Sequence, residues 1–246
     1  MKLLLDMHNH TVASGHAYST VIEIAAEASK KGLKYVGITD HGPKMPGGPH
    51  IYHIGNLKVL PEVIEGVEIL KGVEANILDQ EGSLDVPDHI LKDLDIVLAG
   101  LHEVGFEPWD VDGNTRALLK AMENQYVDVI VHPGNPAFPI DMEKFVLGAK
   151  ESNTLVEINN SSFLTSRIGS KENCYEIARL CKKHKVQIIV GSDSHIAFDV
   201  GRFDEAIKLL KAIDMPEELV INTSIERFID YLKKKGKPRF AKGLKF

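Results

Sequence analysis

The chain of 246 residues contains little cysteine and no long apolar run. A helix that crosses a membrane needs about 20 consecutive apolar residues, and no stretch comes close to that length. The first residues also lack the basic segment, apolar core and cleavage site of a secretory signal. These absences argue against a membrane-spanning chain and predict a cytoplasmic protein with no membrane partner.

The two cysteines, Cys174 and Cys181, are separated by two turns of a stretch with helical periodicity. Their Cα atoms would lie farther apart than a disulfide can bridge. We therefore expect two buried thiols.

A basic excess is also missing, because 29 lysines and arginines face 35 aspartates and glutamates, for a formal net charge of -6. This balance argues against nucleic acid as a partner. The composition, 43% hydrophobic and 26% charged, is that of a globular protein rather than a disordered one. We find no linker, low-complexity segment or internal repeat, so the sequence predicts a single domain over residues 1–246.

Short β-rich runs alternate with amphipathic stretches along the chain, which is typical of an α/β protein with a parallel sheet. The predicted strands are 2–7, 34–39, 69–75, 95–101, 127–131, 154–158 and 186–191, with a possible eighth at 219–222. The predicted helices are 20–31, 114–124, 141–152, 171–184, 203–213 and 224–235, the last with Ser224 as N-cap. Seven or eight such units favour a closed or distorted barrel, and a doubly wound open sheet is the alternative.

The first predicted strand ends in the pair His8 and His10. Side chains alternate along a strand, so both imidazoles point the same way and can bind one metal ion. Two ligands do not make a metal site, so the rest of the chain has to supply the others.

Further metal-binding side chains occur at the ends of five other predicted strands. They are His41, Glu74, His102 and His132, and Asp193 with His195, while His16 lies in the loop after the first strand. The carboxyl ends of parallel barrel strands form one face of the molecule, so all nine side chains should converge there. Of the other histidines, His89 and His184 are expected at surface helix positions, and His50 and His53 lie in a long loop where a substrate contact and a plain surface role are both open.

Seven imidazoles and two carboxylates are too many ligands for one ion. The set therefore predicts two or three divalent ions, with Glu74 able to bridge two of them. Clustered ions can provide a hydroxide nucleophile and bind both sides of an in-line displacement, which suits hydrolysis of a phosphate ester. We take Glu74, Asp193 and His195 as the expected catalytic residues.

These residues resemble the PHP family, named for polymerase and histidinol phosphatase, and are most similar to its stand-alone YcdX-type phosphatases. The resemblance rests on 8–10, His16, 39–41, 72–76, His102, 132–136, 157–163 and 191–195. It implies a distorted (β/α)7 TIM-like barrel with three metal ions, usually zinc and sometimes manganese or iron. It further implies one ion at His8, His10, Glu74 and Asp193, a second at Glu74, His102 and His132, and a third at His16, His41 and His195.

Four further residues are candidates for support or substrate contact. Asp40 is expected to accept a ring N–H of His41 or to cap a helix. Asn159, Arg167 and Arg202 follow the sixth and seventh predicted strands and are the expected substrate contacts. The expected substrate is a small phosphorylated metabolite.

Three other functions remain open. An amidohydrolase also begins with His-X-His, but it typically bridges its metals with a modified lysine, and the fourth strand end carries His102 instead. A phosphodiesterase or nuclease would need a basic groove. A non-catalytic metal-binding protein would more typically have a closed, cysteine-rich site.

Overall fold

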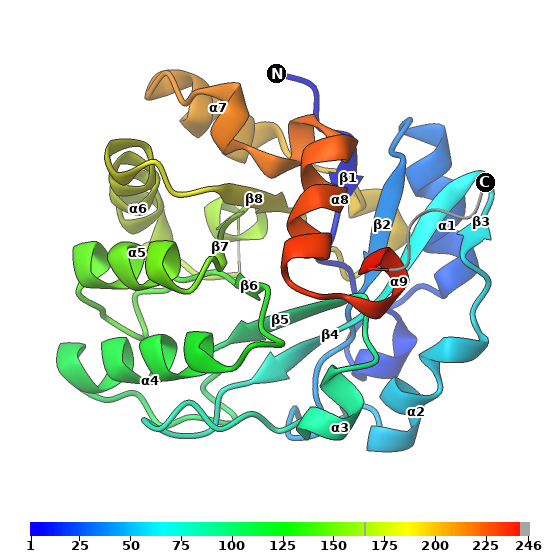
Figure 1. The fold of residues 1–246 in the computed structure, drawn as a ribbon, viewed down its shortest axis with the longest axis horizontal. Helices are drawn as coiled ribbons and strands as arrows, with labels where there is room; N and C mark the ends of the chain where they lie inside the picture. The colour runs from blue at the N-terminus through cyan, green and yellow to red at the C-terminus, as the bar shows by residue number, and fades with distance from the viewer. Residues whose placement is uncertain (165, 242–246) are drawn as a thin grey trace.

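Seven parallel strands form a nearly closed barrel surrounded by helices (Figure 1). The computed structural model describes residues 1–164 and 166–241. The strands, in hydrogen-bonded order, are β1 (Leu5–Asp6), β2 (Tyr35–Ile38), β4 (Val67–Asn76), β5 (Ile96–Gly100), β6 (Val129–Ile130), β7 (Leu155–Asn159) and β8 (Ile188–Gly191). The predicted seven-stranded barrel in one domain is therefore confirmed. Its proposed end at residue 246 lies outside the described residues.

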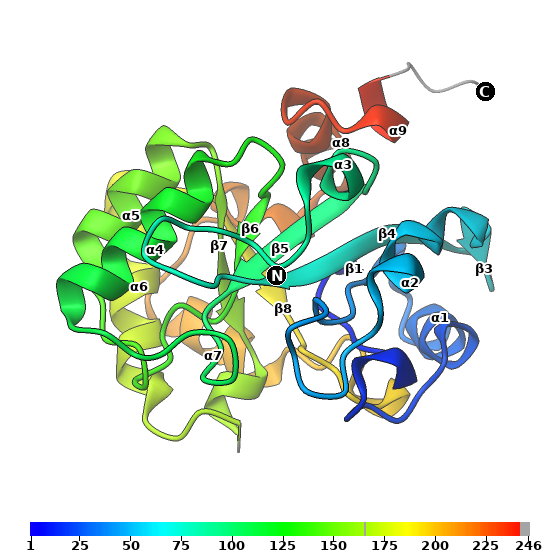
Figure 2. The ribbon, with the colours of Figure 1, turned by 90° about the horizontal axis from the view of Figure 1, so that it is seen from below.

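An additional strand, β3 (Val63–Ile64), pairs antiparallel with the first residues of β4. Figure 2 shows this hairpin at the outer end of the long strand β4, to the side of the barrel. The sequence pattern does not predict β3, because two residues are too short to show alternation.

The predicted eighth strand at 219–222 is wrong. The segment forms two short 3-10 turns, Glu217–Leu219 and Ile221–Thr223, and Val220 makes a single parallel bridge with Ile188. The side chain of Asn222 joins β8 to β1, since it accepts from Val190 N at 2.8 Å and donates to Leu5 O at 3.0 Å. An asparagine amide can pair with both strands at once, so it replaces the ladder that a further strand would form.

The six predicted helices are present, with ends that differ by no more than a few residues. They are α1 (Val21–Lys30), α4 (Val111–Glu123), α5 (Met142–Glu151), α6 (Ser170–His184), α7 (Asp204–Ala212) and α8 (Ile225–Lys234). Ser224 caps α8 as predicted, accepting from Arg227 N. Short helices α2 (Ile51–Gly55), α3 (Asp88–Leu91) and α9 (Pro238–Ala241) were not predicted, because a single turn carries no periodic signal.

The interior of the barrel is apolar toward its amino end. Inward side chains of the strands, such as Leu70 and Ile96, pack with Phe228 and Leu232 of α8, which crosses the strands in Figure 1. Tyr231 of α8 donates to the carbonyl of Asp128, just before β6, so the helix covers the amino ends of the strands. The polar groups of the barrel are therefore concentrated at the carboxyl ends.

Both cysteines lie in α6, and their thiols are free and buried, as predicted. Burial raises the pKa of Cys174 to about 12, so this thiol stays protonated at neutral pH.

Across residues 1–164 and 166–241, no helix combines the length and apolarity needed to cross a membrane.

Candidate metal centre

The carboxyl ends of the strands bring the predicted ligands into one cluster. Neighbouring ring centroids lie 4.3 Å apart for His10 and His41, 4.4 Å for His10 and His195, and 5.1 Å for His41 and His102. The remaining rings join this set: His8 to His10 at 5.1 Å, His16 to His195 at 4.9 Å and His132 to His102 at 5.0 Å. All seven predicted imidazoles therefore belong to one continuous group.

Glu74 lies at the centre of this group and is fully buried. Its Oε1 is 2.8 Å from His132 Nε2 and 3.0 Å from His102 Nε2. Its Oε2 is 2.8 Å from His41 Nδ1 and 3.3 Å from both His8 Nε2 and His10 Nε2. The two oxygens thus face different imidazoles, as a carboxylate that bridges metal ions would.

Three groups of side chains have ligand atoms close enough to share an ion: His8, His10 and Asp193; His41, Glu74 and His102; and His10, His41 and His195. The first group contains three of the four residues predicted for one ion and lacks Glu74. His10 and His41 each occur in two groups, whereas the predicted assignment shares only Glu74 between ions. The assignment of ligands to individual ions stays a prediction. His16 is exposed, and its ring stacks against His41 with the centroids 5.1 Å apart.

Buried polar atoms without hydrogen bonds indicate the kind of ligand that the cluster binds. Within the described residues, five buried polar atoms of the predicted ligands make no hydrogen bond: His8 Nε2, His10 Nε2, His41 Nδ1, Glu74 Oε2 and His102 Nδ1. The first three lie 2.8–3.3 Å from Glu74 Oε2 without hydrogen-bond geometry. Buried polar atoms in folded proteins are almost always paired, so this cluster favours a bound partner from outside the chain. Imidazole and carboxylate ligands suit zinc and related divalent ions, so the residues fit a metal centre.

Two of the histidines are held in the form that binds metal. Burial and the neighbouring His41 lower the pKa of His10 to about 3. Burial and the positive charge of Arg167 lower the pKa of His132 to about 3. Both imidazoles are therefore neutral at neutral pH, with a lone pair free for a cation.

The carboxylates of the cluster are ionised. Burial alone would raise the pKa of Glu74, but His41 and His8 hold it well below its usual range. Burial likewise opposes ionisation of Asp193, whereas His8 and Arg167 lower its pKa well below normal. These negative charges, together with Glu157, outweigh burial and raise the pKa of His8. A divalent cation bound here would neutralise the negative charge of these carboxylates.

Several supporting residues were not predicted from the sequence. Glu157 Oε1 lies 2.6 Å from His8 Nδ1, and Ser14 Oγ lies 3.2 Å from His10 Nδ1. Glu157 shares the inward face of β7 with Leu155 and Asn159, so an inward carboxylate in a strand was the signal that could have identified it. Nothing in the local sequence distinguishes Ser14 from other loop serines.

The predicted pairing of Asp40 with the ring of His41 is wrong. Asp40 accepts from Thr11 N and Ser14 Oγ, both at 2.7 Å, and lies 3.4 Å from His53 Nε2. It therefore fixes the loop that follows β1 and, through Ser14, orients His10. The side chain of His41 lies instead with its Nδ1 2.8 Å from Glu74 Oε2, while the Asp40 oxygens accept from Thr11 and Ser14.

The expected substrate contacts have different surroundings. Asn159 is buried and donates to Asp193 Oδ2 at 3.2 Å, so it supports a ligand. Arg167 donates twice to the same oxygen, at 3.0 Å, and its side chain remains 15% exposed. Arg202 is exposed and pairs with Asp199 at 3.1 Å. Of the two arginines, Arg167 is thus the one that is hydrogen-bonded to a predicted ligand.

The four remaining histidines lie outside the nine-residue set. His50 caps α2, His53 contacts Asp40, His89 is exposed and His184 pairs with Glu143. Only His53 therefore has an indirect link to the centre among these four.

Comparison with known proteins identifies the family. The family model described as PHP domain matches residues 6–237. The chain belongs to the PHP domain family. This PHP domain is 62% identical over 238 residues to a probable phosphatase of Caldanaerobacter subterraneus subsp. tengcongensis, covering 96% of this chain and 94% of that protein. A probable phosphatase of Thermoanaerobacter sp. is 59% identical over 236 residues, covering 96% of each. The predictions of the PHP family and of a phosphatase agree with these relatives.

Solved structures share the fold of this PHP domain. A histidinol phosphate phosphatase from Lactococcus lactis, complexed with Zn, L-histidinol and phosphate, matches with a TM-score of 0.58 and 17% identity, covering 85% of this chain and 93% of that one. A chain of an archaeal ribonuclease P matches with a TM-score of 0.56 and 12% identity, covering 94% and 90%. At these identities the likeness establishes the barrel fold alone.

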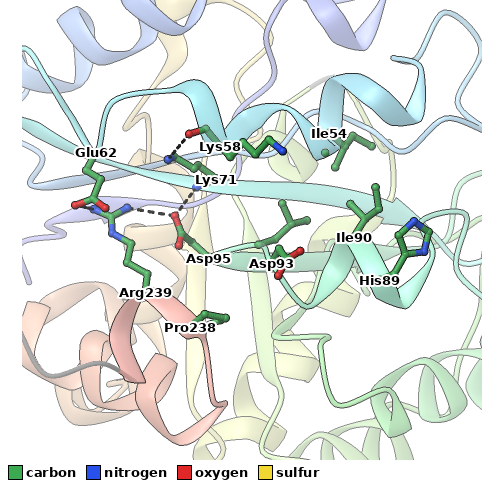
Figure 3. A pocket seen from close by; sticks show the side chains of 12 residues that line it. Ile54, Lys58, Glu62, Lys71, His89, Ile90, Asp93, Asp95, Pro238 and Arg239 are labelled. Atoms are coloured by element: carbon green, nitrogen blue, oxygen red, sulfur yellow. Dashed lines mark hydrogen bonds and ion pairs between the residues drawn. The ribbon is translucent and has the colours of Figure 1, made fainter.

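A separate cavity of about 720 Å³ lies outside the barrel, beside α2, α3 and α9 (Figure 3). Its lining includes Lys71 of β4 and Asp95, which directly precedes β5. Asp95 pairs with Arg239 at 3.2 Å, and Lys71 donates to a main-chain carbonyl. None of the nine predicted ligands lines this cavity, so it is not part of the metal centre.

Proposed function

We propose that the chain hydrolyses a small phosphomonoester at a centre of three divalent ions, with zinc as the first choice and manganese or iron as alternatives. The observation that carries the proposal is the position of Glu74, whose two oxygens face five imidazoles. The family and the names of its relatives support phosphate ester hydrolysis. Cytoplasmic location and the absence of a nucleic-acid partner remain predictions from the sequence.

Bound divalent ions would supply a hydroxide nucleophile at neutral pH and neutralise the charge of the phosphoryl group. The chain's own residues would hold these ions and orient the substrate. Glu74, Asp193 and His195 are the proposed catalytic residues. The side chain of His195 is 32% exposed, more than that of His102 at 11%, so the substrate would approach from the side of His195.

Arg167 is the proposed phosphate contact at this opening. Its guanidinium already donates two hydrogen bonds to Asp193 Oδ2, and arginine forms charge-assisted hydrogen bonds of the same kind with phosphate oxygens. Arg202 is a second proposed contact, through its exposed charge. Asn159 belongs to the proposed substrate site through Asp193, to which its buried amide donates.

Turnover of chromogenic esters tests the function directly. We expect protein loaded with zinc or manganese to hydrolyse p-nitrophenyl phosphate faster than bis(p-nitrophenyl) phosphate, and to leave amide and lactone substrates intact. Protein treated with a chelator and then dialysed is the control. Preference for the diester would favour a phosphodiesterase, cleavage of amides an amidohydrolase, and metal binding without turnover a non-catalytic protein.

Replacement of Arg167 by alanine should raise KM for p-nitrophenyl phosphate. Hydrogen bonds to charged groups contribute about 1.5–3 kcal/mol, so we expect an increase of roughly 10- to 100-fold. The measurement is a substrate titration at saturating metal. Arg202→Ala in the same assay tests the second arginine, and an unchanged KM would remove the altered residue from the substrate site.

A further inference from the structure

We propose that Glu157 is the positioning residue of the metal centre, which orients His8 and fixes the strand ends that carry His132 and Asp193. Glu157 is not one of the nine predicted ligands, and this role rests on the metal binding proposed above. Its side chain is buried inside the barrel, on β7, directly behind the ligands.

Both carboxylate oxygens of Glu157 are engaged. Oε1 accepts from His8 Nδ1 at 2.6 Å. Oε2 accepts from the backbone N–H of His132 at 2.8 Å and from Asn159 Nδ2 at 3.1 Å. Asn159 Nδ2 in turn lies 3.2 Å from Asp193 Oδ2. One carboxylate thereby connects ligands that follow β1, β6 and β8.

The contact with His8 determines which ring nitrogen faces the cluster. With Nδ1 donating to Glu157, His8 Nε2 points toward Glu74 Oε2 at 3.3 Å and Asp193 Oδ1 at 3.5 Å. Nε2 is also one of the five buried polar atoms described above that make no hydrogen bond. A carboxylate on the far nitrogen of a ligating histidine fixes the ring orientation and increases its basicity toward metal.

Two ligands linked to Glu157 have unusual backbone conformations. His132 has φ of 35° and Asp193 has φ of 55°, in the left-handed region that residues other than glycine rarely adopt. Such conformations persist only where surrounding contacts stabilise them. Glu157 stabilises the first through the N–H of His132 and the second through Asn159.

A glycine on the adjacent strand provides the space for this arrangement. A Cβ atom at Gly191 of β8 would collide with Glu157 Oε1 and would lie 3.0 Å from His8 Cβ. The backbone of Gly191 therefore borders the Glu157–His8 contact, and any side chain there would separate the two residues.

The test compares Glu157→Gln with Asp128→Asn. Asp128 is also a buried carboxylate that accepts a backbone N–H, from Val97 at 2.7 Å, but it lies at the amino end of the barrel with Lys237. Zinc affinity is measured by competition with a chromophoric chelator, and melting temperature is recorded for both variants. We expect Glu157→Gln to bind zinc about 10- to 100-fold more weakly and Asp128→Asn to keep wild-type affinity.

A spectroscopic signal and a third variant complete the test. In zinc-loaded protein with ¹⁵N-labelled histidine, the Nδ1 proton signal of His8 should move upfield in Glu157→Gln and stay in place in Asp128→Asn. Gly191→Ala, which displaces the carboxylate without removing it, should also weaken zinc binding. Unchanged affinity in Glu157→Gln and Gly191→Ala, or an equal loss in Asp128→Asn, would overturn the proposal. Zinc affinity is measured without substrate, so the result is independent of whether the protein hydrolyses phosphate esters.

Discussion

Replacing Glu74 with glutamine is expected to reduce kcat for p-nitrophenyl phosphate by about 10³-fold. Both oxygens of Glu74 face imidazoles of the cluster, so the neutral amide removes a charge from the middle of the centre and offers a donor where two acceptors are needed. Stabilisation by bound metal contributes several kcal/mol to such reactions, and a loss of about 4 kcal/mol corresponds to about 10³-fold in rate.

The experiment measures kcat together with the metal content of each preparation. Glu143→Gln is the matched control, because Glu143 is an exposed glutamate that pairs with Lys183 and His184 on the outer surface. We expect this control to retain wild-type activity and metal content. Full activity of metal-replete Glu74→Gln would contradict a mechanism that depends on this carboxylate.

Removal of bound metal should lower the melting temperature by roughly 8–16 °C. A ligand present at about 1,000 times its dissociation constant stabilises the folded state by about 4 kcal/mol, and each kcal/mol moves the melting temperature of a chain of this size by about 2–4 °C. Without metal, five buried polar atoms of the predicted ligands make no hydrogen bond. Removing the metal therefore destabilises the folded state and leaves the free energy of the unfolded chain unchanged.

Calorimetry of chelator-dialysed and reconstituted protein measures this difference. Elemental analysis of protein purified without added metal should give two to three divalent ions per chain. Magnesium, which prefers oxygen ligands, serves as the control cation and should restore little stability. An identical melting temperature in both states, or one ion or none per chain, would count against the proposed centre.

The location of the ligands followed from short sequence patterns. Alternation along the first predicted strand placed His8 and His10 on one face; β1 itself ends at Asp6, yet both imidazoles still reach Glu74 Oε2, at 3.3 Å each. Glu74 and Asp193 converge with them because parallel strands present their carboxyl ends on one face. The geometry brings the predicted ligands together. Local patterns of this kind depend on the chain within a few residues, which is why they are visible in the sequence.

The way in which the barrel closes could not be predicted from local sequence patterns. The run Leu219–Val220–Ile221 has the composition of a strand, yet the chain turns twice and Asn222 joins β8 to β1 with its side chain. The hydrogen bonds of Asn222 to β8 and β1 close this side of the barrel, where the apolar pattern predicts a strand.

By itself the sequence determined the α/β class, the seven parallel strands and the residue types that gather at one end of the barrel. Only the tertiary structure decided how those residues connect: Glu74 between five imidazoles, Glu157 behind His8, and Asp40 bound to Thr11 and Ser14 rather than to His41. The physical reason is distance along the chain. Glu157 and His8 are 149 residues apart, and the 2.6 Å contact between them depends on strand register and loop path, which the whole fold sets.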